Sequence, residues 1–148
     1  MKGYTAALPN GEAIIYIDRK RWLWLMSVLY PLQPFIGIFL HWRTGSEAWL
    51  LLPLAVNYGI GPIVDWLLGE DRNNPPEEVA MQLSQDRYYR WLTYATVLLH
   101  YVTFVGTAWY IATQELSVGG FFALAIVAGM IGGLAINTGH ELGHKNSR

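Results

Sequence analysis

Four long apolar stretches, separated by polar segments, dominate the sequence. The first covers residues 22–42 and contains no Asp, Glu, Lys or Arg, and three more cover about 48–68, 91–112 and 118–139. A helix rises about 1.5 Å per residue, so roughly 20 apolar residues cross the hydrocarbon core of a bilayer. The pattern predicts an all-α, polytopic integral membrane helical bundle with four transmembrane helices.

The connections between these stretches are short, long and short. Turns at 43–47 and 113–117 flank a longer polar segment, 69–90, which predicts two helical hairpins joined across one membrane face. Within that segment, acidic residues follow Pro75-Pro76, a position that favours the first turn of a helix. We expect an amphipathic helix there, lying at the membrane interface on the apolar side chains of Val79 and Leu83.

Lysine and arginine are distributed unevenly among the connections. If the four spans alternate in direction, all of the ten basic residues except Arg43 fall on one side. Basic residues are enriched in the cytoplasmic loops of membrane proteins. We therefore expect residues 1–21 to form a cytoplasmic N-terminal segment and residues 22–148 to form the transmembrane domain, with both ends of the chain in the cytoplasm.

The composition of the chain limits which partners and metal sites it could have. Charged residues make up 14% of the chain, against about 25% in an average soluble domain. The net charge of −1 gives no basic surface for nucleic acid, so we expect no nucleic-acid partner. The chain has no Cys, which excludes disulfides, iron–sulfur clusters and Cys-type zinc sites. A metal must therefore be held by His and carboxylates, and the histidines are His41, His100, His140 and His144.

The strongest candidate for a metal site is NTGHELGHK, residues 137–145, directly after the fourth apolar stretch. Because residues four apart lie on the same face of a helix, His140 and His144 could bind one metal ion or two neighbouring ones. The same letters match HExxH, in which Glu141 would be the general base of a zinc metalloprotease. A third possibility is a non-catalytic membrane segment in which the His pair is incidental.

Further polar residues could support the metal ligands or line a path through the bundle. Asp65 lies at a similar depth to the His pair and is either a solvated acid or a hydrogen-bond partner of a ligand. His100 lies in the middle of the third span, where it must be neutral or paired, and we favour a structural hydrogen bond over a role in a channel. Asn137 precedes the motif, Glu141 lies inside it, and His41 is expected to be uninvolved.

Three separated segments carry a resemblance to a known family. GEDRNNPPEEV at 69–79, RYYRWLTY at 87–94 and NTGHELGHK at 137–145 occur in the order found in the membrane alkane 1-monooxygenases. The resemblance extends over nearly the whole chain, from the first span to Lys145. Three motifs in the correct order are far more specific than HExxH alone.

The resemblance implies a six-helix membrane enzyme with a non-haem di-iron centre, held by histidines from several clusters. Such enzymes use O2 to hydroxylate the terminal methyl of medium-chain alkanes in the bacterial cytoplasmic (inner) membrane. Their electrons come from rubredoxin on the cytoplasmic side. By this resemblance His140 and His144 match the first cluster and would be iron ligands, whereas Glu141 is not carried over as one. No catalytic residue is expected beyond the metal site.

The chain departs from this family in one respect. It stops at Arg148, so the later His clusters and the last two spans of the family are absent. The resemblance therefore implies an N-terminal portion of such an enzyme, inactive by itself, whose remaining iron ligands lie elsewhere.

Overall fold

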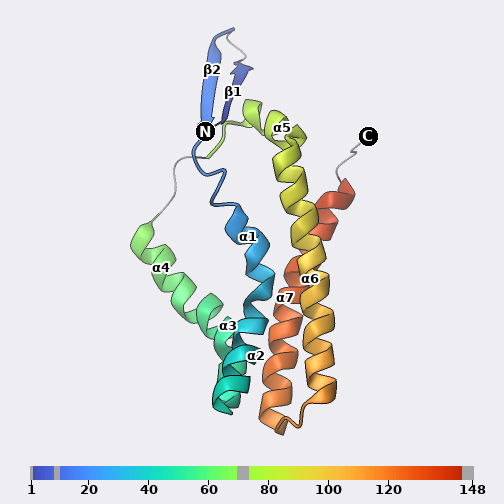
Figure 1. Cartoon of the computed structure of the whole chain (residues 1–148). Helices are drawn as coiled ribbons and strands as arrows, with labels where there is room; N and C mark the ends of the chain where they lie inside the picture. The colour runs from blue at the N-terminus through green and yellow to red at the C-terminus, as the bar shows by residue number, and fades with distance from the viewer. Residues whose placement is uncertain (1, 9–10, 70–73, 145–148) are drawn as a thin grey trace.

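The computed structural model describes residues 2–8, 11–69 and 74–144. The chain is mostly helical, with long helices side by side and a two-stranded sheet at one end (Figure 1). Within these described residues, four helical stretches are long and apolar enough to cross a membrane, which confirms the four spans predicted from the sequence. They are Leu25–Thr44, Glu47–Leu68, Arg87–Thr113 and Val118–Asn137.

The third and fourth spans are each one unbroken helix. Helix α6 runs over Arg87–Thr113 and α7 over Val118–His144. Asp86 caps the start of α6, because its carboxylate accepts a 2.9 Å hydrogen bond from the backbone N–H of Tyr88. At the opposite end of the bundle, Glu47 accepts a 2.8 Å hydrogen bond from the backbone N–H of Ser117, which fixes the start of α7 against the second span.

The first two spans are broken into short helical pieces by proline. Proline has no N–H to donate and is best tolerated in a first helical turn, and Pro31, Pro34, Pro53 and Pro62 each occupy such a position. The pieces of the first span are α1 (Leu25–Leu29), the 3₁₀ turn η1 (Tyr30–Leu32) and α2 (Gln33–Thr44). Those of the second are η2 (Glu47–Leu51), α3 (Leu52–Leu54), the π-helical η3 (Ala55–Ile60) and α4 (Gly61–Leu68).

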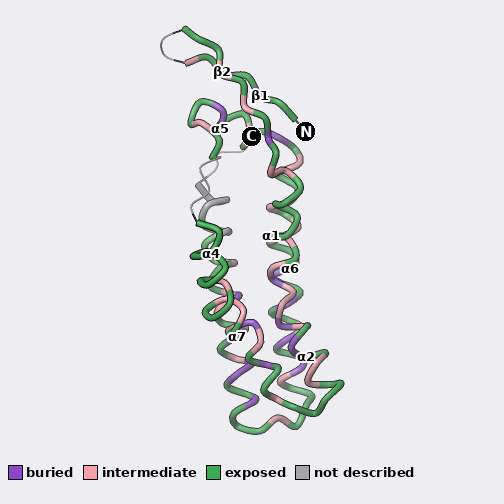
Figure 2. The backbone as a smooth tube through the Cα atoms, turned by 90° about the vertical axis from the view of Figure 1, so that its left-hand side faces the viewer, coloured by how far each residue is buried: buried purple, intermediate pink, exposed green. Residues whose placement is uncertain are grey.

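A polar junction joins these two spans. The amide of Asn57 accepts a 2.6 Å hydrogen bond from the Tyr30 hydroxyl and donates a 2.9 Å hydrogen bond to Gln33. Both partners lie on the first span, so the polar groups of the broken helices satisfy one another inside the bundle. Beyond Asn57, α4 diverges from the other helices and is almost wholly exposed (Figure 2).

A β-hairpin precedes the first span and was not anticipated from the sequence. Strand β1 (Lys2–Ala7) pairs antiparallel with β2 (Ala13–Asp18). One face of the hairpin packs on helix α5 (Glu77–Gln85), where Tyr4 and Ala6 meet the fully buried Val79. The predicted helix at this position is therefore confirmed, but its apolar face is covered by the hairpin, so that Val79 does not face the membrane interface.

Gly37 allows the first two spans to approach closely. A Cβ on residue 37 would lie 2.5 Å from the backbone carbonyl oxygen of Trp49, a distance that real Cβ atoms do not tolerate. We therefore expect Gly37→Ala to destabilise the complete protein by about 1–3 kcal/mol, as overpacking does. Thermal unfolding in detergent measures the effect.

Gly129→Ala is the matched control for this prediction. Gly129 also lies within a span, and a Cβ added there meets no atom within 4 Å among the described residues. This variant should unfold at the wild-type temperature or slightly above it, since alanine favours a helix over glycine. Equal unfolding temperatures for the two variants would contradict the close packing at Gly37.

Candidate metal centre

The histidine pair occupies the last turns of α7. The helix continues from the fourth apolar stretch to His144 without a break, so the backbone places His140 and His144 four residues apart on one helical face. His140 is exposed to its surroundings. The side chains of Glu141 and His144 lie outside the described residues. The helical spacing on which the metal prediction depends is therefore present in the backbone.

The pair does not complete a metal site within the described residues. In that part of the chain, no three side chains of His, Cys, Asp or Glu converge as a metal ion requires. Two imidazoles are fewer than the three or four protein ligands of zinc sites and fewer still than two irons need. Any metal held by His140 and His144 thus requires ligands from beyond the part of the chain described here.

Asp65 lies apart from the histidine pair. It is an exposed residue of α4, the piece that diverges from the bundle, whereas the C-terminal end of α7 lies on the other side of α6 (Figure 1). Asn137 lies on α7 three residues before His140, close to the same helical face, and is exposed. Of these two candidate supporting residues, only Asn137 shares an element with the pair.

His100 makes the structural hydrogen bond favoured from the sequence. Its side chain is buried in the middle of α6, and Nδ1 lies 2.8 Å from the backbone carbonyl oxygen of Thr96. Because a carbonyl can only accept, Nδ1 is the donor in this hydrogen bond. Within the described residues, the Nε2 of the same ring and the hydroxyl of Thr103 are buried without a hydrogen-bond partner. His41, at the far end, pairs at 2.8 Å with the Tyr110 hydroxyl.

A buried ionic cluster at the near end of the bundle was missed in the sequence analysis. Asp86 accepts hydrogen bonds from Arg21 at 2.7 Å, from Lys2 at 2.9 Å and from the Tyr4 hydroxyl at 2.5 Å. Its side chain is only 4% exposed. The Arg21 guanidinium also lies over the ring of Tyr88, 4.0 Å from its centroid. This cluster, which we call the Asp86 cluster, ties the hairpin to the start of α6.

Hydrogen bonds and charges within the Asp86 cluster shift the pKa values of its members. Hydrogen bonds from Arg21, followed by those from Tyr4 and Lys2, hold the pKa of Asp86 well below its usual range. Burial, together with the adjacent Asp86 carboxylate, raises the pKa of Tyr4 to about 12. The hydrogen bond to Asp86 raises the pKa of Arg21. All three groups therefore keep their neutral-pH ionisation states over a wide pH range.

The arrangement of the helices places the metal candidate and the ionic cluster at the same end. The hairpin, α5, the start of α6 and the end of α7 lie together, while the turns after α2 and α6 lie at the opposite end (Figure 1). The basic residues of the hairpin and of α6 are thus on the side of the His pair, and Arg43 is at the other end. This agrees with the uneven distribution of lysine and arginine among the connections in the sequence.

Comparison with known proteins identifies relatives over nearly the whole chain. No protein-family model matches. The chain is 52% identical over 130 residues to alkane 1-monooxygenase 1 of Alcanivorax borkumensis, covering 88% of this chain and 32% of that protein. It is 49% identical over 145 residues to alkane 1-monooxygenase of Pseudomonas putida, covering 98% of this chain and 36% of that one. The chain therefore spans about a third of the length of the curated relatives it matches.

Proposed function

We propose that this chain, a homologue of alkane 1-monooxygenases, is the N-terminal portion of a membrane-embedded di-iron enzyme that hydroxylates the terminal methyl of medium-chain alkanes with O2. The observation that carries the proposal is about 50% identity over most of the chain to enzymes of that name. The His pair at the end of an apolar helix supports it, because it supplies imidazole ligands at the edge of a water-poor bundle. The activity belongs to the complete protein.

His140 and His144 are the residues that would bind iron. Imidazole nitrogen suits iron, the chain offers no thiolate, and the last turns of α7 present both histidines on one face. Bound iron would supply the activation of O2. The role of this chain is to hold the two histidines in place on α7, a helix whose start is anchored by the hydrogen bond between Glu47 and Ser117. The apolar spans exclude water and admit a hydrocarbon from the lipid.

The proposal includes an orientation. The start of the first span and the end of α7 lie on the cytoplasmic side of a bacterial inner membrane, since that end of the bundle carries all the described basic residues except Arg43. A soluble electron donor such as rubredoxin would then reach the His pair from the cytoplasm. The substrate would approach the same site from within the bilayer, without crossing water.

Metal analysis of the complete enzyme tests the proposal. We expect about two iron atoms per purified chain, and little zinc, because a His-rich site completed by downstream clusters holds a di-iron centre. The HELGH letters make a zinc metalloprotease the second candidate, with about one zinc per chain and Glu141 as general base. Elemental analysis distinguishes the two, and protein purified without any metal would favour a non-catalytic membrane segment.

A further inference from the structure

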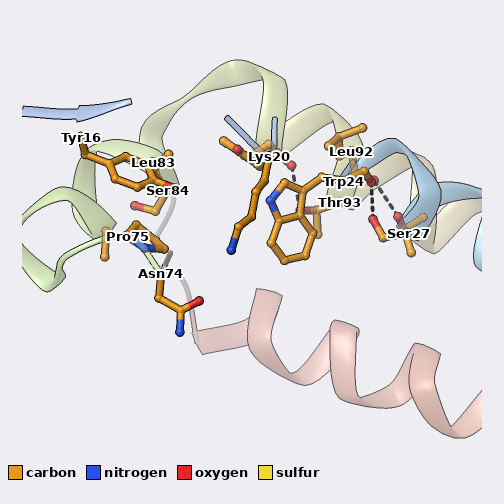
Figure 3. A pocket seen from close by; sticks show the side chains of 13 residues that line it. Tyr16, Lys20, Trp24, Ser27, Asn74, Pro75, Leu83, Ser84, Leu92 and Thr93 are labelled. Carbon is orange, nitrogen blue, oxygen red and sulfur yellow. Dashed lines mark hydrogen bonds between the residues drawn. The ribbon is translucent and has the colours of Figure 1, made fainter. Parts of the chain in front are cut away.

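A cavity of about 500 Å³ lies where the hairpin, α1, α5 and α6 meet (Figure 3). Ligand pockets in proteins commonly have this size. The wall is mostly apolar and includes Trp24 next to α1, Leu83 from α5 and Leu92 from α6. Helix α7, which carries the His pair, contributes none of the described lining residues.

The hydroxyl groups that line the cavity have their protons committed within the protein. Thr93 and Thr96 donate hydrogen bonds of 2.9 Å to the backbone carbonyl oxygens of Tyr89 and Leu92, one turn earlier on α6. A hydroxyl has one proton and two lone pairs, so each of these oxygens can still accept a hydrogen bond but cannot donate another. The same holds for three more lining hydroxyls, which donate to backbone or carboxylate oxygens: Ser27, Ser84 and Tyr89.

Hydrogen-bond acceptors in an apolar wall favour a ligand that has a donor and an apolar chain. A primary alcohol with an alkyl chain meets both requirements. An alkane has no donor, and an aldehyde or a carboxylate of the same length would place its own oxygen lone pairs against those of the wall, where they stay unsatisfied. Tyr16 and Lys20 also line the cavity, but each already has an interaction within the protein, so neither is assigned a role in binding.

The depth of the cavity in the membrane also suits an alcohol. Ser27 lies in the first candidate span and Thr93 in the third, each within the first two turns of its span. The exposed rings of Trp22 and Trp91 lie at the same two span ends, which is the usual position of interfacial aromatic residues. An alcohol dissolved in a bilayer keeps its hydroxyl near this level, because burying a hydroxyl in hydrocarbon without a hydrogen bond is costly.

We propose that this cavity binds a medium-chain primary alcohol, the product of the hydroxylation proposed above, and the identity of the ligand rests on that proposed function. The O–H of the alcohol donates to Oγ1 of Thr93, and its alkyl chain contacts Trp24 and Leu92. In Figure 3 these three side chains lie together at one end of the cavity, beside Ser27. The product thus has a binding site on this chain apart from the His pair.

Photoaffinity labelling of the complete enzyme in lipid nanodiscs, without an electron donor, tests the binding separately from turnover. The probes are a medium-chain 1-alkanol with a diazirine in its chain and the matching diazirine alkane that lacks the hydroxyl. We expect the alkanol to label peptides containing Trp24 or Leu92 about fivefold more than the alkane does, the effect of one neutral hydrogen bond. Added 1-octanol should compete with this labelling, whereas octane and octanoate should not.

Substitutions of threonine on α6 test the assigned acceptor. Thr93→Val keeps the shape of the side chain but removes the oxygen, and should lower labelling by the alkanol about fivefold, to the level of the alkane. Thr93→Ser keeps the hydroxyl and should retain the labelling. Thr113→Val is the matched control, because Thr113 also donates to a carbonyl oxygen one turn earlier on α6, that of Trp109, but lies at the opposite end of the bundle.

Equal labelling by the alkanol and the alkane would overturn the alcohol site, as would undiminished labelling of Thr93→Val or competition by octanoate. The experiment requires no iron, so its outcome is separable from that of the metal analysis. Absence of labelling in an enzyme that contains iron and hydroxylates octane would overturn the alcohol site alone. Labelling of a protein that lacks iron would support the site and count against the proposed function.

Discussion

Replacing His140 or His144 with alanine in the complete enzyme is expected to abolish both iron binding at that position and alkane hydroxylation. The two residues lie four apart at the end of α7, so removing either imidazole leaves the helix intact but takes a ligand from the proposed di-iron centre. We expect a loss of activity of at least about 10²-fold, because even residues that only support metal ligands cost 10–100-fold when removed. Octane hydroxylation and iron content are the two measurements.

His41→Ala is the matched control. This histidine lies on α2 at the opposite end of the bundle and pairs with Tyr110, so its loss should leave iron content unchanged. Retention of octane oxidation by both the His140 and the His144 variants would refute the ligand assignment. Loss of iron from all three variants alike would instead indicate general misfolding, which would remove the support for a specific metal role of α7.

Replacing Asp86 with asparagine is expected to release the hairpin from the start of α6. The substitution keeps the shape of the side chain but leaves the charges of Arg21 and Lys2 without their carboxylate. Breaking a buried ion pair by removing one partner costs about 3–5 kcal/mol. Because Lys2 is half-exposed, we expect the substitution to weaken hairpin docking by about 3 kcal/mol at most. Hydrogen exchange of the β1 and β2 amides measures it.

Asp65→Asn is the control for this experiment. It removes the same charge from an exposed position on α4 and should change hairpin exchange by less than about 0.5 kcal/mol. Equal hairpin protection in wild type and the Asp86 variant would show that the ionic cluster does not hold the hairpin.

The pKa shifts of the Asp86 cluster predict a pH range for hairpin docking. The lowered pKa of Asp86 stabilises the docked state above about pH 4, its usual value, and this stabilisation is lost progressively as the pH falls further. The raised pKa of Tyr4 stabilises the docked state below about pH 10, and this stabilisation is lost as the pH rises toward 12. Hairpin protection should therefore be flat between these limits and fall on both sides.

The four spans were predictable because they depend on composition within a single stretch. The apolar run at 118–139 continues directly into His140, and the structure has one helix over Val118–His144. The third span was predicted at 91–112, whereas α6 begins at Arg87. Hydropathy locates the apolar part of a helix, but α6 begins where Asp86 caps it, in a charged segment that hydropathy does not detect.

The hairpin and the Asp86 cluster were not predictable in the same way. The strands are short and of mixed composition, and the local signal of a hairpin was the sequence Pro9-Asn10-Gly11, whose residue types favour turns. Its stability depends on partners such as Val79 and Asp86 that are remote in the sequence. Likewise, the proximity of Asp65 to the His pair was inferred from depth alone, and the divergence of α4 at the π-helical η3 is a tertiary feature.

The distance along the chain between the hairpin and its anchor has a consequence for biogenesis. Tyr4 and Lys2 bind a carboxylate that is 82 and 84 residues further on, with two candidate membrane spans between them. If both spans cross the membrane, the hairpin cannot dock on this carboxylate during synthesis until both have been inserted and the chain has returned to the side on which it started. Docking would then be a late event that closes a long loop, and it would occur only in molecules whose first two spans were inserted correctly.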